Sequence, residues 1–433
     1  MHFLSLAFQN ITMRIAFSKK DLNTTTWFSL GKLIHLFTGV FIVPKIFNTL
    51  GTTDMGILTL AGSILGMFAP LFTLGLSAIC VREIVFTPKR SQHIIATAFF
   101  MRLLSWGFVA IGFVCYLYFT NNTTLLVIYM VLICGYLFRL TDVFEYYLLA
   151  KKRAKLIFIG KTVSLFCIVA LQYYGVKQQM DILFFAQVIA LDFLLQGVFY
   201  IVVLGTKNEL YLKRWCFSKS LGKKLLTMAF PLIVSEALVM IYIGIDEVIL
   251  KHFYNDHANG VFGSVQFLVI GLSWTLGFAI INALYPSLTE SFQNHKKYYY
   301  IKNKQLFFIL VALGLFIAWF YLFFGDSILD SYFTEQYREG KTALQIFCWA
   351  PLFVFIGMLY EKHLLTANRL KHNVYRFIVG CFVNLLLCYV LIPIYYINGA
   401  AIAVLASHFI TNIGYLAFDS NTKKDIKSLL NAK

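Results

Sequence analysis

Charged residues are scarce in this chain. Only 13% of its 433 residues are Asp, Glu, Lys or Arg, whereas 59% are hydrophobic. An ordinary soluble domain has about 25% charged residues, and a soluble chain of this composition would expose large sticky patches. The sequence therefore excludes an ordinary globular protein and favours one whose solvent is the lipid bilayer.

Patterns that mark disulfide, metal and nucleotide sites are also missing. The eight Cys residues lie almost all in apolar runs without paired spacing, and the nine His residues show no metal-ligand spacing. The tripeptide at 160–162 resembles the end of a P-loop, but Lys155 stands where the first Gly is required. We therefore expect no catalytic residues, no metal site and no cofactor.

Long apolar runs fill most of the chain. A membrane-spanning helix needs about 20 mostly apolar residues, and twelve such windows follow one another. They cover residues 27–47, 55–80, 94–119, 125–149, 156–174, 182–205, 225–250, 261–289, 305–325, 343–365, 374–396 and 399–418. The sequence therefore predicts an all-α polytopic membrane protein with twelve transmembrane helices.

Positive charge alternates between the loops. Of the 37 Lys and Arg residues, 26 lie in one alternate set of segments and five in the other. The 26 fall within residues 1–26, 82–90, 151–155, 206–224, 296–304, 369–371 and 419–433. Loops rich in Lys and Arg stay in the cytoplasm, so we expect both termini there. Topology thus accounts for the net charge of +17, and nucleic acid is not an expected partner.

The longest basic loop separates the twelve windows into two sets of six. An offset of 204 residues places Gly56 on Gly260 and Lys32 on Glu236, as expected of parallel repeats. Each half then opens with a long helix, a short polar outer loop (residues 48–54 and 255–259) and a Gly that begins the next helix. The expected organisation is a cytoplasmic N-terminal segment at 1–26, an N-lobe at 27–205, a basic cytoplasmic linker at 206–224, a C-lobe at 225–418 and a cytoplasmic tail at 419–433.

Six basic residues fall inside the predicted spans, where a charge costs about 2.5–3.5 kcal/mol at mid-bilayer. Arg376 and Lys362 lie near span ends, so we expect them to snorkel to the interface. Arg102 has no carboxylate three or four residues away, which makes it the stronger candidate for an external anion. The residues expected to line a basic cavity for an anionic substrate group are Lys32, Arg102, Arg139 and Lys161.

Carboxylates inside the spans are candidates for ion coupling or gating. Asp142 is three residues from Arg139, on the same helix face, so the two could also form a private structural ion pair. Glu236, near the middle of the seventh window, could carry a proton, hold Na⁺ with Tyr242, or only hydrogen-bond within the bundle. The candidate coupling residues are Asp142, Asp192, Glu236 and Asp246.

Four stretches carry a family resemblance. They read WFSLGK at 27–32 with LGTTDMG at 50–56, LGL at 74–76 with VRE at 81–83, FPLI at 230–233 with IDEV at 245–248, and LIP at 391–393 with NGAAIA at 398–403. In this order they resemble the O-antigen and polysaccharide flippases (Wzx type) of the multidrug/oligosaccharidyl-lipid/polysaccharide (MOP) exporter superfamily.

The resemblance implies two six-helix lobes in the V shape of MATE-type transporters around a central cavity. It also implies that undecaprenyl-diphosphate-linked oligosaccharide crosses the bacterial inner membrane by alternating access, driven by H⁺ or Na⁺. The partners would be this lipid-linked substrate, membrane lipids, a polysaccharide polymerase and a chain-length regulator. A basic first half would compensate the charge of the diphosphate in a low-dielectric cavity.

Two other functions stay open. A MATE-type drug or cation antiporter has the same fold, but cationic drugs favour an acidic cavity. A membrane glycan polymerase or ligase would usually need a larger outward loop with catalytic groups, which the sequence does not offer. We therefore expect a transporter and not an enzyme.

Overall fold

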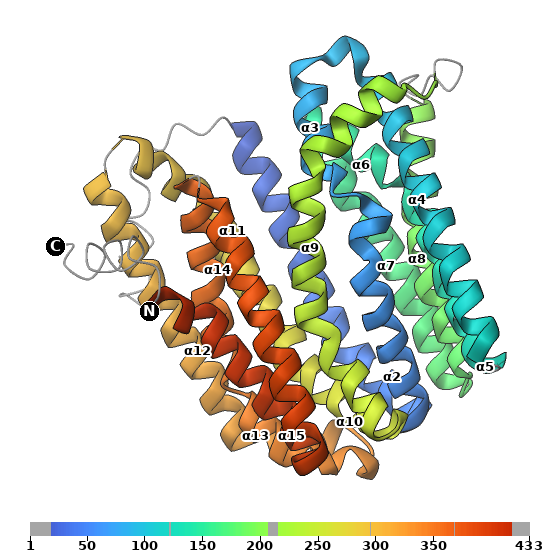
Figure 1. Ribbon diagram of the computed structural model, residues 1–433, viewed down its shortest axis with the longest axis vertical. Coiled ribbons are helices and arrows are strands. Elements are labelled where there is room, and N and C mark those ends of the chain that lie inside the picture. Colours follow the sequence, from blue (N-terminus) through green and yellow to red (C-terminus); the bar gives the residue numbers. More distant parts are fainter. Residues whose placement is uncertain (1–18, 121–122, 207–214, 295, 368, 418–433) are drawn as a thin grey trace.

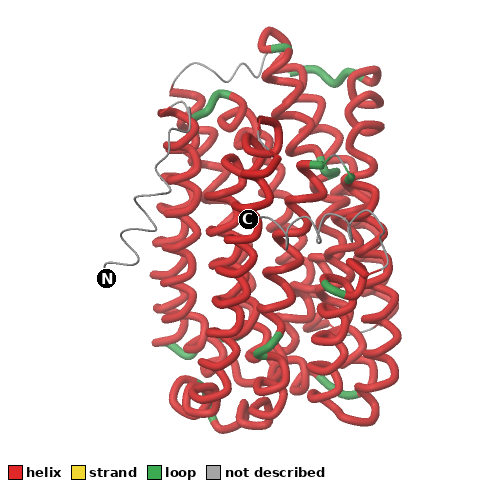
Figure 2. The backbone as a smooth tube through the Cα atoms, turned by 90° about the vertical axis from the view of Figure 1, so that its left-hand side faces the viewer, coloured by secondary structure: helices red, strands yellow, loops and turns green. Residues whose placement is uncertain are grey.

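The computed structural model describes residues 19–120, 123–206, 215–294, 296–367 and 369–417. Within these ranges the chain is almost entirely helical and contains no strand (Figure 2). Part of the expected N-terminal segment, much of the expected linker and the whole of the expected tail lie outside the described residues. The predicted all-α fold is confirmed.

The described residues of the first half form seven α-helices. They are α2 (Lys19–Thr73), α3 (Leu76–Phe86), α4 (Ser91–Thr120), α5 (Thr123–Phe138), α6 (Asp142–Ala150), α7 (Ala154–Lys177) and α8 (Ile182–Thr206). Those of the second half are α9 (Lys219–Phe253), α10 (Asp256–Gln266), α11 (Leu272–Asn294), α12 (Lys296–Tyr332), α13 (Lys341–Phe347), α14 (Ala350–Thr366) and α15 (Leu370–Asn412).

Helix lengths account for twelve membrane crossings. Nine helical stretches among the described residues are long and apolar enough to span a bilayer, and the bent pair Glu335–Phe347 with Ala350–Thr366 makes a tenth. Leu30–Phe86 and Lys371–Asn412 have 57 and 42 residues, which at 1.5 Å per residue is about twice the 30 Å thickness of the hydrocarbon core or more. Each of these two stretches contains a backbone break and crosses twice.

The two long helices reverse at residues with a left-handed backbone. Gly51 in α2 has φ 71°, a value that Gly adopts without steric cost. Tyr396 in α15 has φ 57°. Gly399 makes the return of α15 possible, because a Cβ there would overlap the carbonyl oxygen of Leu391.

Three predicted boundaries differ from the structure. The outer loops expected at 48–54 and 255–259 are largely helical, since α2 bends at one residue and α10 begins at Asp256. The window at 343–365 is bent by 50° between α13 and α14, where Pro351 removes a backbone donor in the first turn of α14. The window at 125–149 is interrupted by the 3₁₀ turn Arg139–Thr141.

The helices form two lobes that diverge like a V (Figure 1). Helices α3 to α8 belong to one lobe and α11 to α15 to the other. Between them, α2 packs on α7, α9 and α10, while α9 packs on α15. The lobes meet at the end that carries α10 and α13, called the closed end, and separate toward the end that carries α3, called the open end.

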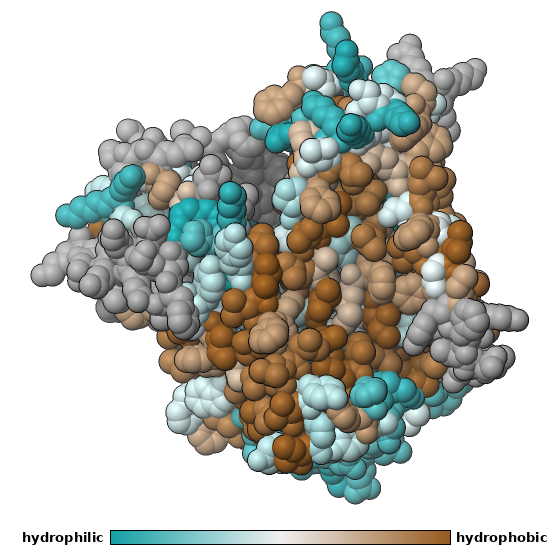
Figure 3. Space-filling view, viewed as in Figure 1, coloured by the Kyte–Doolittle hydropathy of each residue, from teal (hydrophilic) through white to brown (hydrophobic). Residues whose placement is uncertain are grey.

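The surface fits a membrane environment. In the space-filling view apolar side chains cover the middle of the molecule, polar ones gather at its two ends, and a notch separates the lobes at the open end (Figure 3). Many large apolar side chains are exposed, such as Phe108 of α4 at 79% and Phe323 of α12 at 68%. Such exposure suits contact with lipid tails and not with water.

At the closed end α2 and α10 touch through their backbones. A Cβ at Gly56 would overlap the carbonyl oxygen of Asp256, and a Cβ at Gly260 would overlap that of Thr52. The offset of 204 relates Gly56 to Gly260 and also Thr52 to Asp256, so the contact is reciprocal, as around a two-fold axis. Small residues at a helix crossing allow this close approach.

Hydrogen bonds from α2 to the second half flank the glycine contact. Four of them join residues of α2 to α10, to the end of α12 or to the turn after it. They are Asn48 Nδ2 to the Tyr332 carbonyl at 2.8 Å, the Thr334 amide to Asn48 Oδ1 at 2.9 Å, Tyr337 Oη to the Phe47 carbonyl at 2.8 Å, and Thr52 Oγ1 with His257 Nδ1 at 2.6 Å.

Apolar packing divides the first lobe into two clusters. One cluster includes Leu76 and Leu148, and the other includes Phe72 and Phe185. Arg102 forms hydrogen bonds to a residue of each cluster. Its acceptors are the Tyr146 hydroxyl of the first cluster and the Phe72 carbonyl of the second. A charged layer therefore lies between the two apolar clusters of this lobe.

Candidate functional site

Arg102 is completely buried and fully engaged by the protein. Its Nε donates to the carbonyl oxygen of Phe72 at 3.1 Å and its Nη2 to that of Arg139 at 2.9 Å. Its Nη1 donates to Tyr146 Oη at 3.2 Å. Both carbonyl groups lie at helix ends. Phe72 is the last residue but one of α2, which ends at Thr73, and Arg139 directly follows α5, which ends at Phe138. Arg102 thus satisfies backbone oxygens that are costly to leave unpaired inside a membrane.

The contacts of Arg102 are with the protein itself, and its contact with an external anion stays a prediction. The guanidinium does not line the neighbouring cavity, since it is held by two backbone carbonyls and a tyrosine. The sequence could not reveal this role, because the acceptors appear only once the helix breaks are known.

A cavity of about 590 Å³ adjoins the charged layer. Two bases line it, Arg139 from the 3₁₀ turn and Lys161 from α7. Three carboxylates line it as well. They are Asp142 and Glu145 from α6 and Glu236 from α9. We call it the N-lobe cavity. The structure thus brings four predicted site residues together: Arg139, Lys161, Asp142 and Glu236.

Both bases of the N-lobe cavity are paired with carboxylates. Arg139 Nε lies 3.2 Å from Asp142 Oδ2, and Lys161 Nζ lies 2.8 Å from Glu145 Oε1. Asp142 Oδ2 is also 3.6 Å from Arg102 Nη2. The Arg139 and Lys161 side chains remain 34% and 37% exposed. A guanidinium has five donors, so Arg139 can bind a further acceptor in the cavity.

Lys32 and Asp192 lie outside the lining of this cavity. The Lys32 ammonium is 4.9 Å from the centre of the Phe278 ring of α11, on the opposite lobe. Asp192 Oδ1 accepts a hydrogen bond from Ser164 Oγ at 2.5 Å, which joins α8 to α7.

Asp246 is separate from Glu236 although both belong to α9. It is completely buried, and its Oδ2 accepts a hydrogen bond from Gln266 Nε2 at 2.6 Å. Its Oδ1 and the Oε2 of neighbouring Glu247 have no hydrogen-bond partner among the described residues. Glu247 lines a further cavity of about 340 Å³ near the closed end.

Arg376 corrects an expectation, because it does not snorkel. Its side chain is 1% exposed, its Nη1 donates to the Gly357 carbonyl at 3.0 Å, and its Nη2 lies 3.9 Å from Glu361 Oε2. Counting residues from the span end predicted an interfacial position, but α14 and α15 pack over the side chain. Lys362 lies beside this pair, with its ammonium 5.1 Å from the centre of the Tyr285 ring.

A repeat in the sequence could have identified Glu361 as the counterpart of Glu145. Residues 145–155 read EYYLLAKKRAK and residues 361–371 read EKHLLTANRLK, so an offset of 216 matches a Glu, two Leu, an Arg and a Lys. Glu145 and Glu361 correspond. Glu145 pairs with Lys161, 16 residues later, and Glu361 pairs with Arg376, 15 residues later. Both lobes therefore carry an acid–base pair built on corresponding acids, while the offset places Lys161 on Phe377, one residue after Arg376.

Sequence comparison identifies relatives of the chain. Residues 22–292 match the family described as polysaccharide biosynthesis protein. The capsular polysaccharide biosynthesis protein CapF of Staphylococcus aureus is 24% identical over 197 residues, which are 45% of this chain and 50% of that protein. The chain thus matches about half the length of this curated relative.

Solved structures share the fold. An inward-facing multidrug resistance MATE family transporter of the MOP superfamily superposes with a TM-score of 0.68 at 13% identity, over 98% of each chain. A MOP superfamily transporter from Pyrococcus furiosus, described as having a binding pocket of reversed polarity, gives 0.63 at 13% identity, over 96% of this chain and 100% of the other. This chain is therefore a multi-pass membrane protein with the MOP transporter fold, and it belongs to the polysaccharide biosynthesis protein family.

Proposed function

We propose that the protein is a flippase that moves undecaprenyl-diphosphate-linked oligosaccharide across the bacterial inner membrane by alternating access. The observation that carries the proposal is the N-lobe cavity, in which Arg139 and Lys161 are held inside the membrane and remain open to a ligand. Membership of a polysaccharide biosynthesis family supports a glycan as the cargo.

The ion pairs of the cavity favour an exchange with the substrate. Asp142 and Glu145 compensate the two bases while the cavity is empty. A diphosphate that binds Arg139 and Lys161 takes the place of the carboxylates. A carboxylate that loses its cation inside a membrane is stable only if it takes up a proton or a metal cation. Glu145 would lose its ion pair with Lys161, whereas Asp142 would keep Arg102 at 3.6 Å. Substrate binding would thereby be coupled to H⁺ or Na⁺ through Glu145, with Asp142 moving from Arg139 toward Arg102.

The proposed orientation places the open end in the cytoplasm. Lys89 and Arg90 lie in the turn after α3, at the open end, and basic loops stay on the cytoplasmic side. The N-lobe cavity would then receive its substrate from the cytoplasmic leaflet. Both termini would be cytoplasmic, and the released substrate would pass to a polysaccharide polymerase with its chain-length regulator.

Further carboxylates support proton coupling. Glu236 lines the N-lobe cavity on α9, and Asp246 is buried without an ion pair among the described residues. A buried carboxyl group in this setting is stable when protonated. Each of these carboxyl groups would take up a proton and release it again as α9 moves between the lobes. Asp192 would act more locally, through the hydrogen bond that joins α8 to α7.

A drug or cation antiporter is the second candidate, because three carboxylates and only two bases line the N-lobe cavity. Asp142 and Glu145 are already paired with Arg139 and Lys161, however. Only Glu236 is left to attract a cationic drug, so this candidate ranks second.

Deletion of the gene, followed by analysis of lipid-linked intermediates on each leaflet, tests the proposal. We expect the oligosaccharide lipid to accumulate on the cytoplasmic leaflet and the wild-type protein to restore its export. Arg139→Ala should fail to restore it, whereas Lys151→Ala, at an exposed turn, serves as the matched control. Normal export in the deletion strain, together with efflux of a cationic dye that Glu236→Gln abolishes, would support the antiporter instead.

A further inference from the structure

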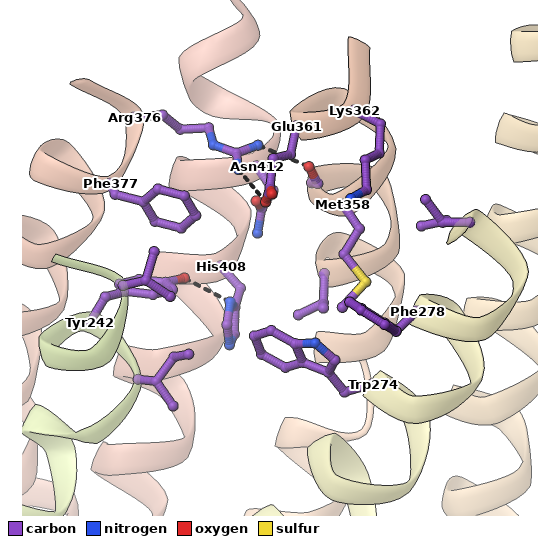
Figure 4. A pocket seen from close by; sticks show the side chains of 15 residues that line it. Tyr242, Trp274, Phe278, Met358, Glu361, Lys362, Arg376, Phe377, His408 and Asn412 are labelled. Atoms are coloured by element: carbon purple, nitrogen blue, oxygen red, sulfur yellow. Dashed lines mark hydrogen bonds and ion pairs between the residues drawn. The ribbon is translucent and has the colours of Figure 1, made fainter. Parts of the chain in front are cut away.

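The second half contains a cavity of its own, of about 240 Å³, enclosed by α9, α11, α14 and α15 (Figure 4). We call it the C-lobe cavity. It shares Val239 of α9 with the N-lobe cavity, so the two cavities adjoin. One extended ligand can therefore contact both.

Aromatic side chains form much of the wall of the C-lobe cavity. Trp274 and Phe278 of α11 lie on one side, and Tyr242 of α9 and Phe377 of α15 lie on the other (Figure 4). Met358 of α14 lies beside Phe278 and lines the cavity on the same side. Flat apolar surfaces of this kind bind the apolar face of a ligand ring.

Polar groups lie among the aromatic ones. Glu361, Asn412 and Arg376 are grouped at one end of the cavity (Figure 4). The Arg376 side chain is 1% exposed, and its Nε has no hydrogen-bond partner among the described residues. Its guanidinium lies 4.7 Å from the centre of the Phe377 ring. Deeper in the cavity, Tyr242 Oη and His408 Nδ1 are 2.7 Å apart.

The internal repeat shows how the two cavities have diverged. The offset of 216, which relates Glu145 to Glu361, also relates Arg139 to Phe355 and Asp142 to Met358. The ion pair of the N-lobe cavity is thus replaced by two apolar residues in the second half. The C-lobe cavity keeps one acid–base pair and gains an apolar wall, which is a poorer site for a diphosphate.

We propose that the C-lobe cavity is a saccharide subsite, which holds a pyranose ring of the oligosaccharide while the N-lobe cavity holds the diphosphate. A pyranose has apolar C–H faces and a rim of hydroxyl groups. The C-lobe cavity offers aromatic rings for the faces, and Glu361, Asn412 and Arg376 for the hydroxyls. The assignment rests on the proposed function, because it takes the glycan of that same substrate as the ligand.

The test compares two lipids on the purified full-length protein by native mass spectrometry. One is undecaprenyl diphosphate without sugar, and the other is the oligosaccharide lipid extracted from the membranes of the producing cells. Trp274→Ala should weaken binding of the oligosaccharide lipid about tenfold and change binding of the sugar-free lipid less than about twofold. Arg139→Ala should weaken both.

Three further variants make the test specific. Trp274→Phe keeps a ring and should retain most of the binding. Trp319→Ala removes a Trp from α12 that is 53% exposed and should change neither affinity. Glu361→Gln alters a half-exposed side chain and should selectively weaken binding of the oligosaccharide lipid. This variant keeps the test decisive if Trp274→Ala does not fold.

The outcomes separate the two proposals. Equal losses for both lipids in Trp274→Ala and Glu361→Gln, or no loss in either, would overturn the saccharide subsite and leave the flippase proposal intact. Failure of the wild-type protein to bind either lipid would count against the proposed function itself.

Discussion

Arg102 Nη2 donates a hydrogen bond to the carbonyl oxygen of Arg139 at 2.9 Å, so one buried cation fixes the backbone from which the other reaches the cavity. The two residues therefore have different roles. Arg102 holds the ends of two helices together, whereas Arg139 presents donors to the N-lobe cavity. Their substitutions should separate stability from transport.

Arg102→Lys should destabilise the protein. A single ammonium cannot reach the Phe72 carbonyl, the Arg139 carbonyl and the Tyr146 hydroxyl together. Breaking a buried charged network costs about 3–5 kcal/mol, so we expect a lower melting temperature in detergent and less protein in the membrane. Arg90→Lys, at an exposed turn, is the control. Unchanged stability with lost transport would mean that Arg102 acts on the substrate.

Glu145→Gln should strengthen binding of the sugar-free diphosphate lipid. The carboxylate lies 2.8 Å from Lys161 Nζ and competes with the ligand for this cation. Its neutralisation should raise the affinity about fivefold, measured by native mass spectrometry. Glu335→Gln changes an exposed carboxylate near the closed end and should have no effect. Weaker binding in Glu145→Gln would show that the carboxylate orients Lys161 and does not compete.

Gly56→Val should prevent the closed end from forming, because the side chain would overlap the Asp256 carbonyl. The readout is a disulfide between Asn48→Cys and Thr334→Cys, whose positions are hydrogen-bonded, in a protein without its eight native Cys residues. The cross-link should form in the parent and be lost with Gly56→Val. It should persist with Gly62→Val, since a Cβ there meets nothing within 4 Å. Persistence in both would refute the role of this contact.

Asp246→Asn should remove the dependence of transport on an imposed proton gradient while the protein still folds. The amide oxygen of Asn can accept the hydrogen bond from Gln266. The substitution also removes the free-energy cost of burying a group that can ionise. The measurement is uptake into proteoliposomes with and without a gradient. Asp330→Asn alters an exposed ion pair with Lys341 and is the control. Retained gradient dependence would exclude Asp246 as a coupling group.

The sequence predicted the features that depend on local pattern. Apolar windows located the crossings, and the three-residue spacing of Arg139 and Asp142 offered an ion pair as one alternative, which is present in the structure at 3.2 Å. Features that depend on helix breaks were missed. The turn at Arg139 has no Pro or Gly within it, so nothing indicated that its carbonyl would need Arg102. Arg376 was misplaced because its depth depends on how α14 and α15 pack.

The backbone contact of Gly56 with α10 has an energetic consequence. At Gly56 itself the two backbones meet without an intervening side chain. Earlier in the same helix, Phe47 of α2 is buried against the rings of Phe267, Phe333 and Tyr337. Interhelical hydrogen bonds in membranes contribute about 0.6 kcal/mol each, so the four that flank the contact resist separation by roughly 2–3 kcal/mol. The packing of Phe47 in the apolar cluster of the second half adds to that resistance. A substrate or ion that opens this end must therefore bind the separated state more tightly than the closed one by at least this amount of free energy.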